Sequence, residues 1–202
     1  MHGTTPLQPE TRRSTRDHLI RCGVELCTEA GFQSTGIEGV LRKASVPKGS
    51  FYHYFKSKQD FGLAVIDAYA QYFGDKLARV LEDESLSPLA RLKRFVAEAE
   101  AGMARYDYRR GCLVGNLGQE LAGLNEAFRE RLEQVLRSWE AQTAACLRQA
   151  QEAGELASGA DAGQLAEFFW IGWEGAILRA KLTRSAEPMH RFAGGFFSRM
   201  AV

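Results

Sequence analysis

The sequence has 202 residues, of which 45% are hydrophobic and 25% are charged, so it can bury a core and is not a disordered chain. Its net charge is only +1, but residues 1–58 carry nine Lys and Arg against five Asp and Glu, which makes this end the one that would attract a polyanion. No apolar run reaches the roughly 18 residues of a membrane span and the polar N-terminal segment lacks the apolar centre of a signal peptide, so we expect a cytoplasmic protein without a membrane partner.

The spacing of hydrophobic residues predicts helices along almost the whole chain. Apolar residues recur at steps of three and four, the period of a helix with one buried face, and no segment alternates as a strand would. Only five prolines interrupt the pattern. We therefore expect an all-α fold with two parts: a three-helix helix-turn-helix domain over residues 1–57 and a larger helical domain over residues 58–202.

Short helices follow a longer one in the first domain. The first helix is expected over residues 9–30. The second begins where Thr35 and Glu38 have the spacing of a capping box, in which two side chains satisfy free backbone N–H groups, and it ends near Ala44. Pro47 suits the first turn of a third helix, because proline loses no helical hydrogen bond there. This order of helices is typical of a helix-turn-helix layout.

The larger domain begins with a helix that Ser57 can cap, with Asp60 in its first turn. Residues 82–88 are expected to form a surface loop. Apolar residues then recur over residues 124–150 at helical spacing, which predicts one long helix with a single buried stripe. Gly154 is expected to end this helix.

The stretch PKGSFYHYFKSK, residues 47–58, has the side chains of a nucleic-acid contact. Its hydroxyl, imidazole and amine groups are the kinds that bond phosphates and base edges. Phe51 and Phe55, four residues apart, would anchor the stretch to the preceding helices, and Gly49 would let the backbone approach DNA closely. A short surface helix with ordinary solvated charges explains the composition equally well.

The same stretch resembles the signature of TetR-type bacterial transcriptional repressors, in which SFYHYFKSK follows a Pro-Lys-Gly turn and an upstream segment such as GFQSTGIEGVL. The resemblance covers about residues 12–62. It implies a homodimer bound to palindromic double-stranded operator DNA, with half-sites spaced by the dimer. Phosphates would be held by Tyr54 and Lys56, and base edges read by Lys48, Ser50 and His53. In all, the resemblance places eight residues at the operator: Thr35, Lys48, Gly49, Ser50, Tyr52, His53, Tyr54 and Lys56.

Two C-terminal segments predict a pair of packed helices. In residues 165–182, Trp170, Trp173, Glu174 and Lys181 fall in one sector of a helical wheel, about 100° wide. This helix and the one after it could form a four-helix dimer interface with their symmetry mates, as TetR-type proteins do. The two charges in the sector either neutralise partners on neighbouring helices or orient a small polar ligand in an effector cavity.

Cys112 lies in RRGCLVGNLGQE, residues 109–120, among unusual neighbours. The chain has four cysteines without a CxxC pair and its histidines lack metal-ligand spacing, so we expect free thiols, no metal and no cofactor. If a helix starts near Gly111, its free N–H groups and the guanidinium of Arg109 or Arg110 would favour the thiolate. Three roles therefore remain open for Cys112: a buried core residue, a catalytic nucleophile or a sensor.

A closer resemblance bears on this choice. RRGCLVGNLGQE, FWIGWEGAILRAKL and VPKGSFYHYFKSKQDFGLAVIDAYAQYF are similar to the AcuR/NemR-like branch of TetR-type repressors. AcuR-like members respond to acrylate, NemR-like members sense electrophiles and reactive chlorine through a cysteine, and the C-terminal segments are nearer the AcuR-like members. The resemblance implies that Cys112 is the sensing centre and Lys181 its partner. We expect one effector cavity lined by Cys112, Asn116, Gln119, Trp170, Trp173, Glu174 and Lys181.

These patterns predict a transcriptional repressor whose small-molecule inducer acts near Cys112 and moves the helix from residue 57 to about residue 81. The alternative is a thiol peroxidase or transferase with Cys112 as its nucleophile, but no histidine lies near it in the sequence to act as a base. A protein that only binds other proteins would explain the helices but not the basic motif. We therefore expect no enzymatic activity.

Overall fold

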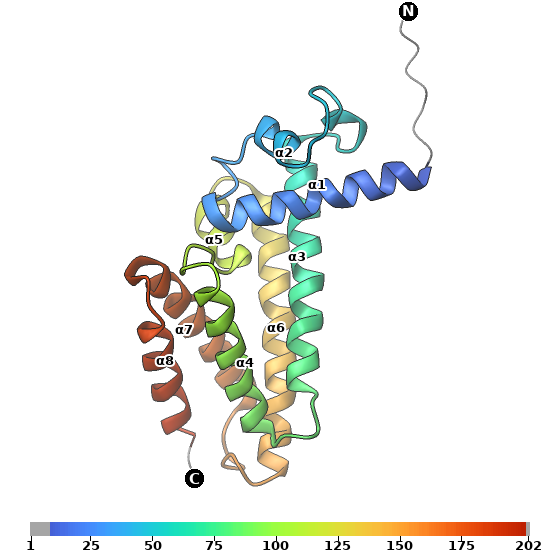
Figure 1. Cartoon of the computed structure of the whole chain (residues 1–202). Coiled ribbons are helices and arrows are strands. Elements are labelled where there is room, and N and C mark those ends of the chain that lie inside the picture. Colours follow the sequence, from blue (N-terminus) through green and yellow to red (C-terminus); the bar gives the residue numbers. More distant parts are fainter. Residues whose placement is uncertain (1–8, 201–202) are drawn as a thin grey trace, which may run out of the picture.

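The computed structural model describes residues 9–200, with side chains from residue 13 onwards, and confirms the all-α fold (Figure 1). Over this range the chain has no strand, and none of its helices has the length and apolar character needed to cross a membrane. The elements are α1 (Pro9–Ala30), α2 (Ile37–Lys43), a 3₁₀ turn (Phe51–His53), α3 (Lys58–Leu81), α4 (Pro88–Ala104), α5 (Leu113–Leu121), α6 (Glu126–Glu152), α7 (Ala162–Thr183) and α8 (Glu187–Ser198).

A small head forms one end of the molecule, where α1 crosses the start of α3 and α2 lies above it (Figure 1). The rings of Phe51, Phe55 and Phe61 are buried and pack with centroids 4.9 to 5.5 Å apart. Aromatic pairs at this separation stabilise a core beyond the area that they bury. Because Phe61 belongs to α3, this cluster joins the head to the larger domain.

The third helix expected from Pro47 is wrong, because this region forms a single 3₁₀ turn. Gly49 has a φ of +89°, a left-handed conformation that cannot continue a right-handed helix. Helical geometry begins only after it, at Phe51, and ends at His53. The polar side chains of residues 47–56 are therefore presented from a turn and not from one face of a helix.

The capping box expected of Thr35 and Glu38 is also wrong. The residue that caps α2 is Gly36, and it makes no side-chain cap bond. The hydroxyl of Thr35 instead donates to the carbonyl oxygen of Gly31 at 2.6 Å, and Glu38 lies 3.3 Å from the amine of Lys48. The Thr35 hydroxyl is therefore bonded to the turn at Gly31 and does not cap α2.

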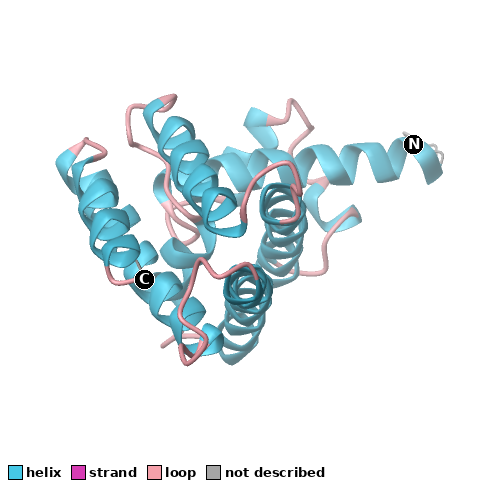
Figure 2. Cartoon of the chain, turned by 90° about the horizontal axis from the view of Figure 1, so that it is seen from below, coloured by secondary structure: helices cyan, strands magenta, loops and turns pink. Residues whose placement is uncertain are grey.

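The start of α3 is capped as expected. The hydroxyl of Ser57 accepts a hydrogen bond from the N–H of Asp60 at 3.0 Å, and the carboxylate of Asp60 accepts one from the N–H of Lys56 at 2.8 Å. This reciprocal pair satisfies two backbone donors that the helix start leaves free. From there α3 runs beside α6, and the two form the long axis of the molecule (Figures 1 and 2).

The expected apolar stripe of α6 forms the core of the larger domain. Leu132, Val135 and Trp139 are buried. The ring of Trp170 on α7 packs against Trp139 at 5.1 Å, and its N–H donates to the hydroxyl of Thr143 at 3.0 Å. A buried indole that has found its acceptor fixes the rotation of α7 against α6.

The ends of α6 agree with the sequence in part. Leu124, the first residue of the expected stripe, is exposed and precedes the helix, because the side chain of Asn125 caps it by accepting from the N–H of Phe128 at 3.2 Å. The helix ends just before Gly154, whose φ is +74°, as expected. Residues 82–87 form the expected loop, and α4 begins at Pro88.

α7 and α8 lie side by side along one edge of the molecule (Figures 1 and 2). The inner face of α7 is buried and carries both of its tryptophans. Its outer face exposes large apolar side chains to between 37% and 70%, which is the composition of an interface rather than of a solvated surface. These side chains are Phe168, Ile171, Leu178 and Leu182.

Candidate functional site

The segment 47–56 gathers polar side chains at the tip of the head. Lys48, Tyr52, His53 and Lys56 are exposed, and the ring of Tyr52 is 68% exposed. A tyrosine ring this exposed contributes little to the head's own core. The segment therefore offers two amines, a phenol and an imidazole to a partner outside the chain.

Four other residues expected at the operator are placed differently. Gly49 exposes its backbone, whereas Ser50 is half-buried and its hydroxyl donates to the carbonyl oxygen of Pro47 at 2.5 Å. Tyr54 is half-buried against the hydrophobic core. Thr35 is buried and bonded to the backbone, so its side chain is not presented at the surface in this conformation.

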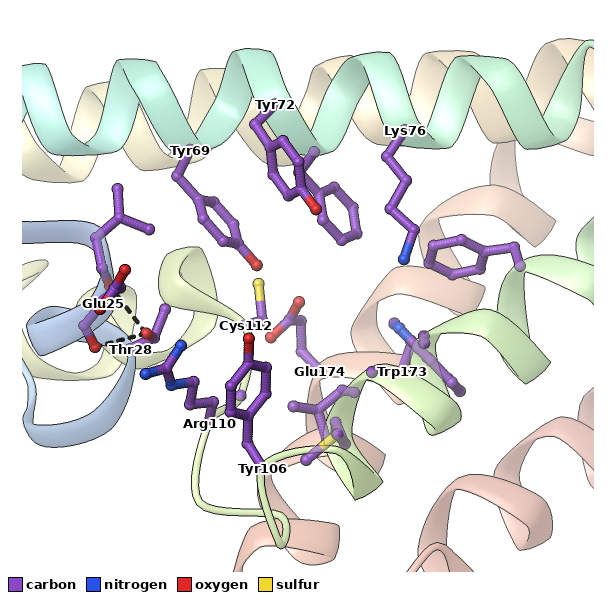
Figure 3. A pocket seen from close by; sticks show the side chains of 18 of the residues that line it. Glu25, Thr28, Tyr69, Tyr72, Lys76, Tyr106, Arg110, Cys112, Trp173 and Glu174 are labelled. Atoms are coloured by element: carbon purple, nitrogen blue, oxygen red, sulfur yellow. Dashed lines mark hydrogen bonds between the residues drawn. The ribbon is translucent and has the colours of Figure 1, made fainter. Parts of the chain in front are cut away.

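A cavity of about 270 Å³ lies between α1, α3, α4, α7 and the loop that precedes α5 (Figure 3). Apolar side chains form much of the wall, namely Phe73, Phe95, Met103, Trp170, Trp173 and Ile177. The other lining residues supply hydroxyls, a thiol and charges, namely Glu25, Thr28, Tyr69, Tyr72, Lys76, Tyr106, Arg110, Cys112 and Glu174. A mostly apolar pocket with a few convergent polar groups is the usual form of a small-molecule site.

Cys112 is the residue immediately before α5 and points into this cavity, between the hydroxyl of Tyr69 and the carboxyl of Glu174 (Figure 3). Burial, followed by the charge of Glu174, raises the pKa of the Cys112 thiol well above its ordinary value. The N–H groups at the start of α5 act in the opposite direction but more weakly. Cys112 is therefore a thiol at neutral pH.

The expectation that the two arginines before Cys112 favour its thiolate is wrong. The guanidinium of Arg110 binds the carboxylate of Glu29 at 2.6 Å and lies 4.1 Å from the centre of the Tyr106 ring. Arg109 is exposed and lines a different depression. Proximity in the sequence did not decide which charge acts on the thiol, because the charge with the largest effect on its pKa comes from Glu174 of α7.

Glu174 is the most perturbed carboxyl of the cavity. Burial raises its pKa to about 7, although a hydrogen bond with Cys112 acts in the opposite direction. One of its oxygens, Oε1, is buried without a hydrogen-bond partner among the described residues. The other, Oε2, lies so close to α5 that a Cβ atom at Gly115 would be only 1.9 Å away. Glu174 thus fills a place that the glycine leaves open.

Asn116, Gln119 and Lys181 do not line this cavity, so the single cavity expected from the sequence is wrong. They line a second depression, beside the end of α1, together with Glu120. The amine of Lys181 donates to the side-chain oxygen of Asn116 at 3.3 Å and not to Cys112. Glu174 and Lys181 are seven positions apart, so the two share a sector of α7 but lie about 10 Å apart along it.

The cavity also contains residues that the sequence reasoning missed. Tyr69, Tyr72 and Lys76 project into it from α3, and Tyr106 from the turn that follows α4 (Figure 3). The α3 residues recur at steps of three and four, which was a detectable signal. Their polar ends were not recognised because tyrosines at this spacing are also typical of core packing.

A second missed residue, Glu120, connects α5 to the head. Its Oε2 accepts from the N–H of Phe32 at 2.8 Å, and its Oε1 accepts from the N–H of Gln33 at 2.6 Å. These amides belong to the loop between α1 and α2. A further contact of α5 with the head runs from the side-chain amide of Asn116 to the carbonyl oxygen of Thr28, at 3.2 Å. The residue that precedes this short helix therefore lines the cavity, and the helix itself binds the head through Asn116 and Glu120.

Two protein-family models match the chain. Residues 19–65 match the model described as "Bacterial regulatory proteins, tetR family", and residues 88–196 match "Tetracyclin repressor-like, C-terminal domain". Together they span the head and most of the larger domain.

Relatives and solved structures agree with these matches. The chain is 55% identical to the transcriptional regulator AcuR of Cereibacter sphaeroides, over 88% of this chain and 81% of that protein. It is 31% identical to the transcriptional repressor NemR of Escherichia coli, over 91% and 92% of the two chains. The crystal structure of a regulatory protein TetR from Rhodobacter sphaeroides superposes with a TM-score of 0.89 at 53% identity, covering 93% of this chain and 99% of that one. Reduced E. coli NemR gives a TM-score of 0.83 at 29% identity, covering 93% and 97%.

Proposed function

This chain belongs to the TetR family of bacterial transcriptional regulators, and we propose that it is a repressor that leaves its operator when a small unsaturated carboxylate or a related electrophile occupies the cavity beside Cys112. The observation that carries this proposal is the position of α5, which borders the cavity at Cys112 and binds the head through Glu120. DNA binding is assigned to residues 1–57, and effector sensing and dimerisation to residues 58–202.

The head supports the DNA-binding half of the proposal. Exposed amines bind phosphates and exposed side chains on a turn can enter a groove, so Lys48, Tyr52, His53 and Lys56 are proposed to contact the operator. Gly49, Ser50 and Tyr54 are proposed to support them. The excess of positive charge in residues 1–58 would add a salt-dependent attraction to the phosphates.

The outer face of α7 supports a homodimer. TetR-family regulators act as dimers, and a palindromic operator requires two heads related by a two-fold axis. The exposed apolar side chains of α7, such as Ile171 and Leu182, would be buried against the same face of a second copy, with α8 completing a four-helix interface. The cavity lies on the opposite, inner side of α7.

The chemistry of the cavity supports a small acid with a flat, unsaturated body. Aromatic rings such as Phe95 and Trp173 can pack on the faces of conjugated carbon atoms, and the charges of Lys76 and Arg110 favour an anion. Because the thiol of Cys112 is protonated, non-covalent binding would come first and any addition to the thiol would follow. The residues that line the cavity include no histidine, which weakens the alternative of a thiol enzyme.

Release from DNA requires that the cavity and the head be coupled. The sequence suggested α3 as the connecting element, and α5 offers a second route through Glu120. α1 also touches both sites, since Thr28 lines the cavity. A coupling free energy of about 1 to 3 kcal/mol would weaken operator binding about 5- to 150-fold.

The DNA-binding assignment is tested by Lys48→Ala and Tyr54→Ala. We expect each variant to lose operator binding, measured by fluorescence anisotropy at moderate salt, while size-exclusion chromatography still shows the dimer. Arg137→Ala on α6 is the matched control, because it also removes one exposed positive charge but lies outside the head. Loss of the dimer in Lys48→Ala or Tyr54→Ala would instead assign these residues to folding.

The role of Cys112 is tested by operator release combined with intact-mass spectrometry. The protein is exposed to acrylate, N-ethylmaleimide and hypochlorite, and DNA release and mass are followed in parallel. Release without a mass change indicates reversible binding, and release with an adduct on Cys112 indicates chemistry. If Cys112→Ser responds as the unmodified protein does, Cys112 is not the sensing centre.

A further inference from the structure

One oxygen of Glu174 has no bonding partner in a place built to receive the carboxyl group. Oε1 is buried and accepts no hydrogen bond from the described residues. Oε2 occupies space that exists only because Gly115 has no Cβ atom. Buried polar atoms of native proteins are normally paired, so an unpaired carboxyl oxygen at the edge of a cavity indicates a partner from outside the chain. Figure 3 shows this carboxyl group facing the centre of the cavity.

The neighbours of Glu174 are neutral. Tyr69 of α3 and Cys112 before α5 face it, and burial raises the pKa of both groups well above their ordinary values, so both keep their protons near neutral pH. The cations of the cavity, Lys76 and Arg110, already lie 4.0 and 2.6 Å from carboxylates outside it. Neither cation lowers the pKa of Glu174, which responds to burial and to the hydrogen bond with Cys112, so neither favours its ionised form.

Three further titratable side chains line the cavity. Tyr72 comes from α3, Tyr106 follows α4, and Glu25 comes from α1. Glu25 is bound to Lys43 at 2.9 Å, and this hydrogen bond lowers the pKa of Glu25, which keeps it ionised near neutral pH. α6 and α8 contribute no titratable side chain to the lining. Among the carboxyl groups of the cavity, Glu174 is thus the one able to hold a proton.

We propose that Glu174 sets the ligand selectivity of the cavity, and that a carboxylate ligand binds together with one proton that lies between its own oxygen and Oε1 of Glu174. This inference rests on the proposed class of effector. Two ionised carboxylates in contact would repel each other, whereas one shared proton converts the contact into a charge-assisted hydrogen bond.

The proposal predicts that binding depends on pH in a defined direction. Burial raises the pKa of Glu174 to about 7, so its proton is present in mildly acidic solution and must be supplied from solvent above that pH. The affinity for a carboxylate should therefore fall about tenfold for each pH unit above this value, with uptake of close to one proton per ligand. The ligand's own carboxyl group, with a pKa near 4, stays ionised throughout and adds no slope.

Calorimetric titration of the full-length protein with acrylate and with propionate, from pH 6 to 8.5, tests this prediction. Propionate is saturated and cannot add to Cys112, so a slope seen with both acids comes from binding alone. Repeating the titration at pH 8 in buffers with different ionisation enthalpies measures the proton uptake of the unaltered protein. Glu174→Gln should bind both acids with no pH dependence, while Glu25→Gln, which changes the other glutamate of the lining, should retain the slope.

Affinity that does not change with pH, or a slope that persists in Glu174→Gln, would overturn the proposal and leave the class of effector intact. Failure of both acids to bind at pH 6 would overturn the proposal and the effector class together, while operator binding by the head stays unaffected. If Glu174→Gln does not fold, the proton uptake of the unaltered protein still decides, because a value near zero at pH 8 contradicts a shared proton.

Discussion

Glu120, in the last turn of α5, and Glu174 of α7, which packs against the first turn of α5, each lie beside a glycine, but only Glu120 has hydrogen-bond partners for both of its oxygens. Both oxygens of Glu120 accept backbone N–H groups of the head, at 2.8 and 2.6 Å, whereas Oε1 of Glu174 accepts none from the described residues. A Cβ atom would lie 2.7 Å from Glu120 at Gly31 and 1.9 Å from Glu174 at Gly115. The head end of α5 is therefore fixed by the protein's own backbone, and the cavity end retains a bonding capacity for a ligand or a proton.

The largest expected effect concerns the protonation of Glu174. Its pKa is raised from 4.5 to about 7 in the folded protein, so the stability that it contributes is complete below pH 4.5 and is lost as pH rises to 7. The free energy of unfolding, relative to that of Glu174→Gln, should fall by about 3 kcal/mol between pH 4.5 and pH 8. Urea unfolding at both pH values and at one protein concentration measures this difference.

Glu25→Gln provides the control of sign. The pKa of Glu25 is lowered by its hydrogen bond with Lys43, so its contribution to stability is lost as pH falls and not as pH rises. A parallel response of Glu174→Gln and Glu25→Gln to pH would mean that the two carboxyl groups share one environment, contrary to the structure.

A smaller effect is expected at the satisfied end, from Glu120→Ala. This change leaves two N–H groups of the α1–α2 loop without their acceptor, at a cost of about 2 kcal/mol in the free energy of unfolding. It should also reduce the effect of an effector on operator affinity, because one connection between cavity and head is lost. Gln119→Ala, at the exposed neighbouring position, should change stability by less than about 0.5 kcal/mol. Equal effector responses in the two variants would show that Glu120 of α5 does not couple the cavity to the head.

The smallest effect is expected from Gly115→Ala. The new methyl group would displace Glu174, and the overpacking, partly offset by the better helix propensity of alanine, should cost about 1 kcal/mol. Gly118→Ala is a matched control on the same helix, since a Cβ there meets nothing within 4 Å, and it should leave stability unchanged or slightly higher. Thermal unfolding compares the two, and propionate binding should be weakened in Gly115→Ala alone.

Hydrophobic spacing predicted the long helices well, because each buries one stripe along its whole length. The stripe of α6 around Trp139 is the clearest example. The short elements of the head were predicted less well, since a single conformation decides them: the left-handed Gly49 reduced an expected helix to one turn. The helix caps were also predicted only in part. Ser57 caps α3 as expected, whereas the hydroxyl of Thr35 donates to a backbone carbonyl instead of capping α2.

The sequence predicted cavity residues correctly only where they lie at the same height along the axis of α7. A helical wheel shows direction but not depth, so it grouped Glu174 with Lys181, although only Glu174 reaches the cavity. The charge next to Cys112 came from another helix and could not be read from Arg109 and Arg110. Contacts between segments far apart in the sequence, such as that of Glu120 with the α1–α2 loop, leave no periodic trace.

The nine-residue length of α5 has a consequence for how ligand specificity can evolve in such a protein. The helix is too short to bend appreciably, so a displacement of its first turn reaches its last turn almost unchanged. Most of the side chains that line the cavity lie on α3, α4 and α7, and none of them takes part in the hydrogen bonds of Glu120. Substitutions around the cavity can therefore exchange one chemical signal for another, and the inherited response at the DNA end stays in place.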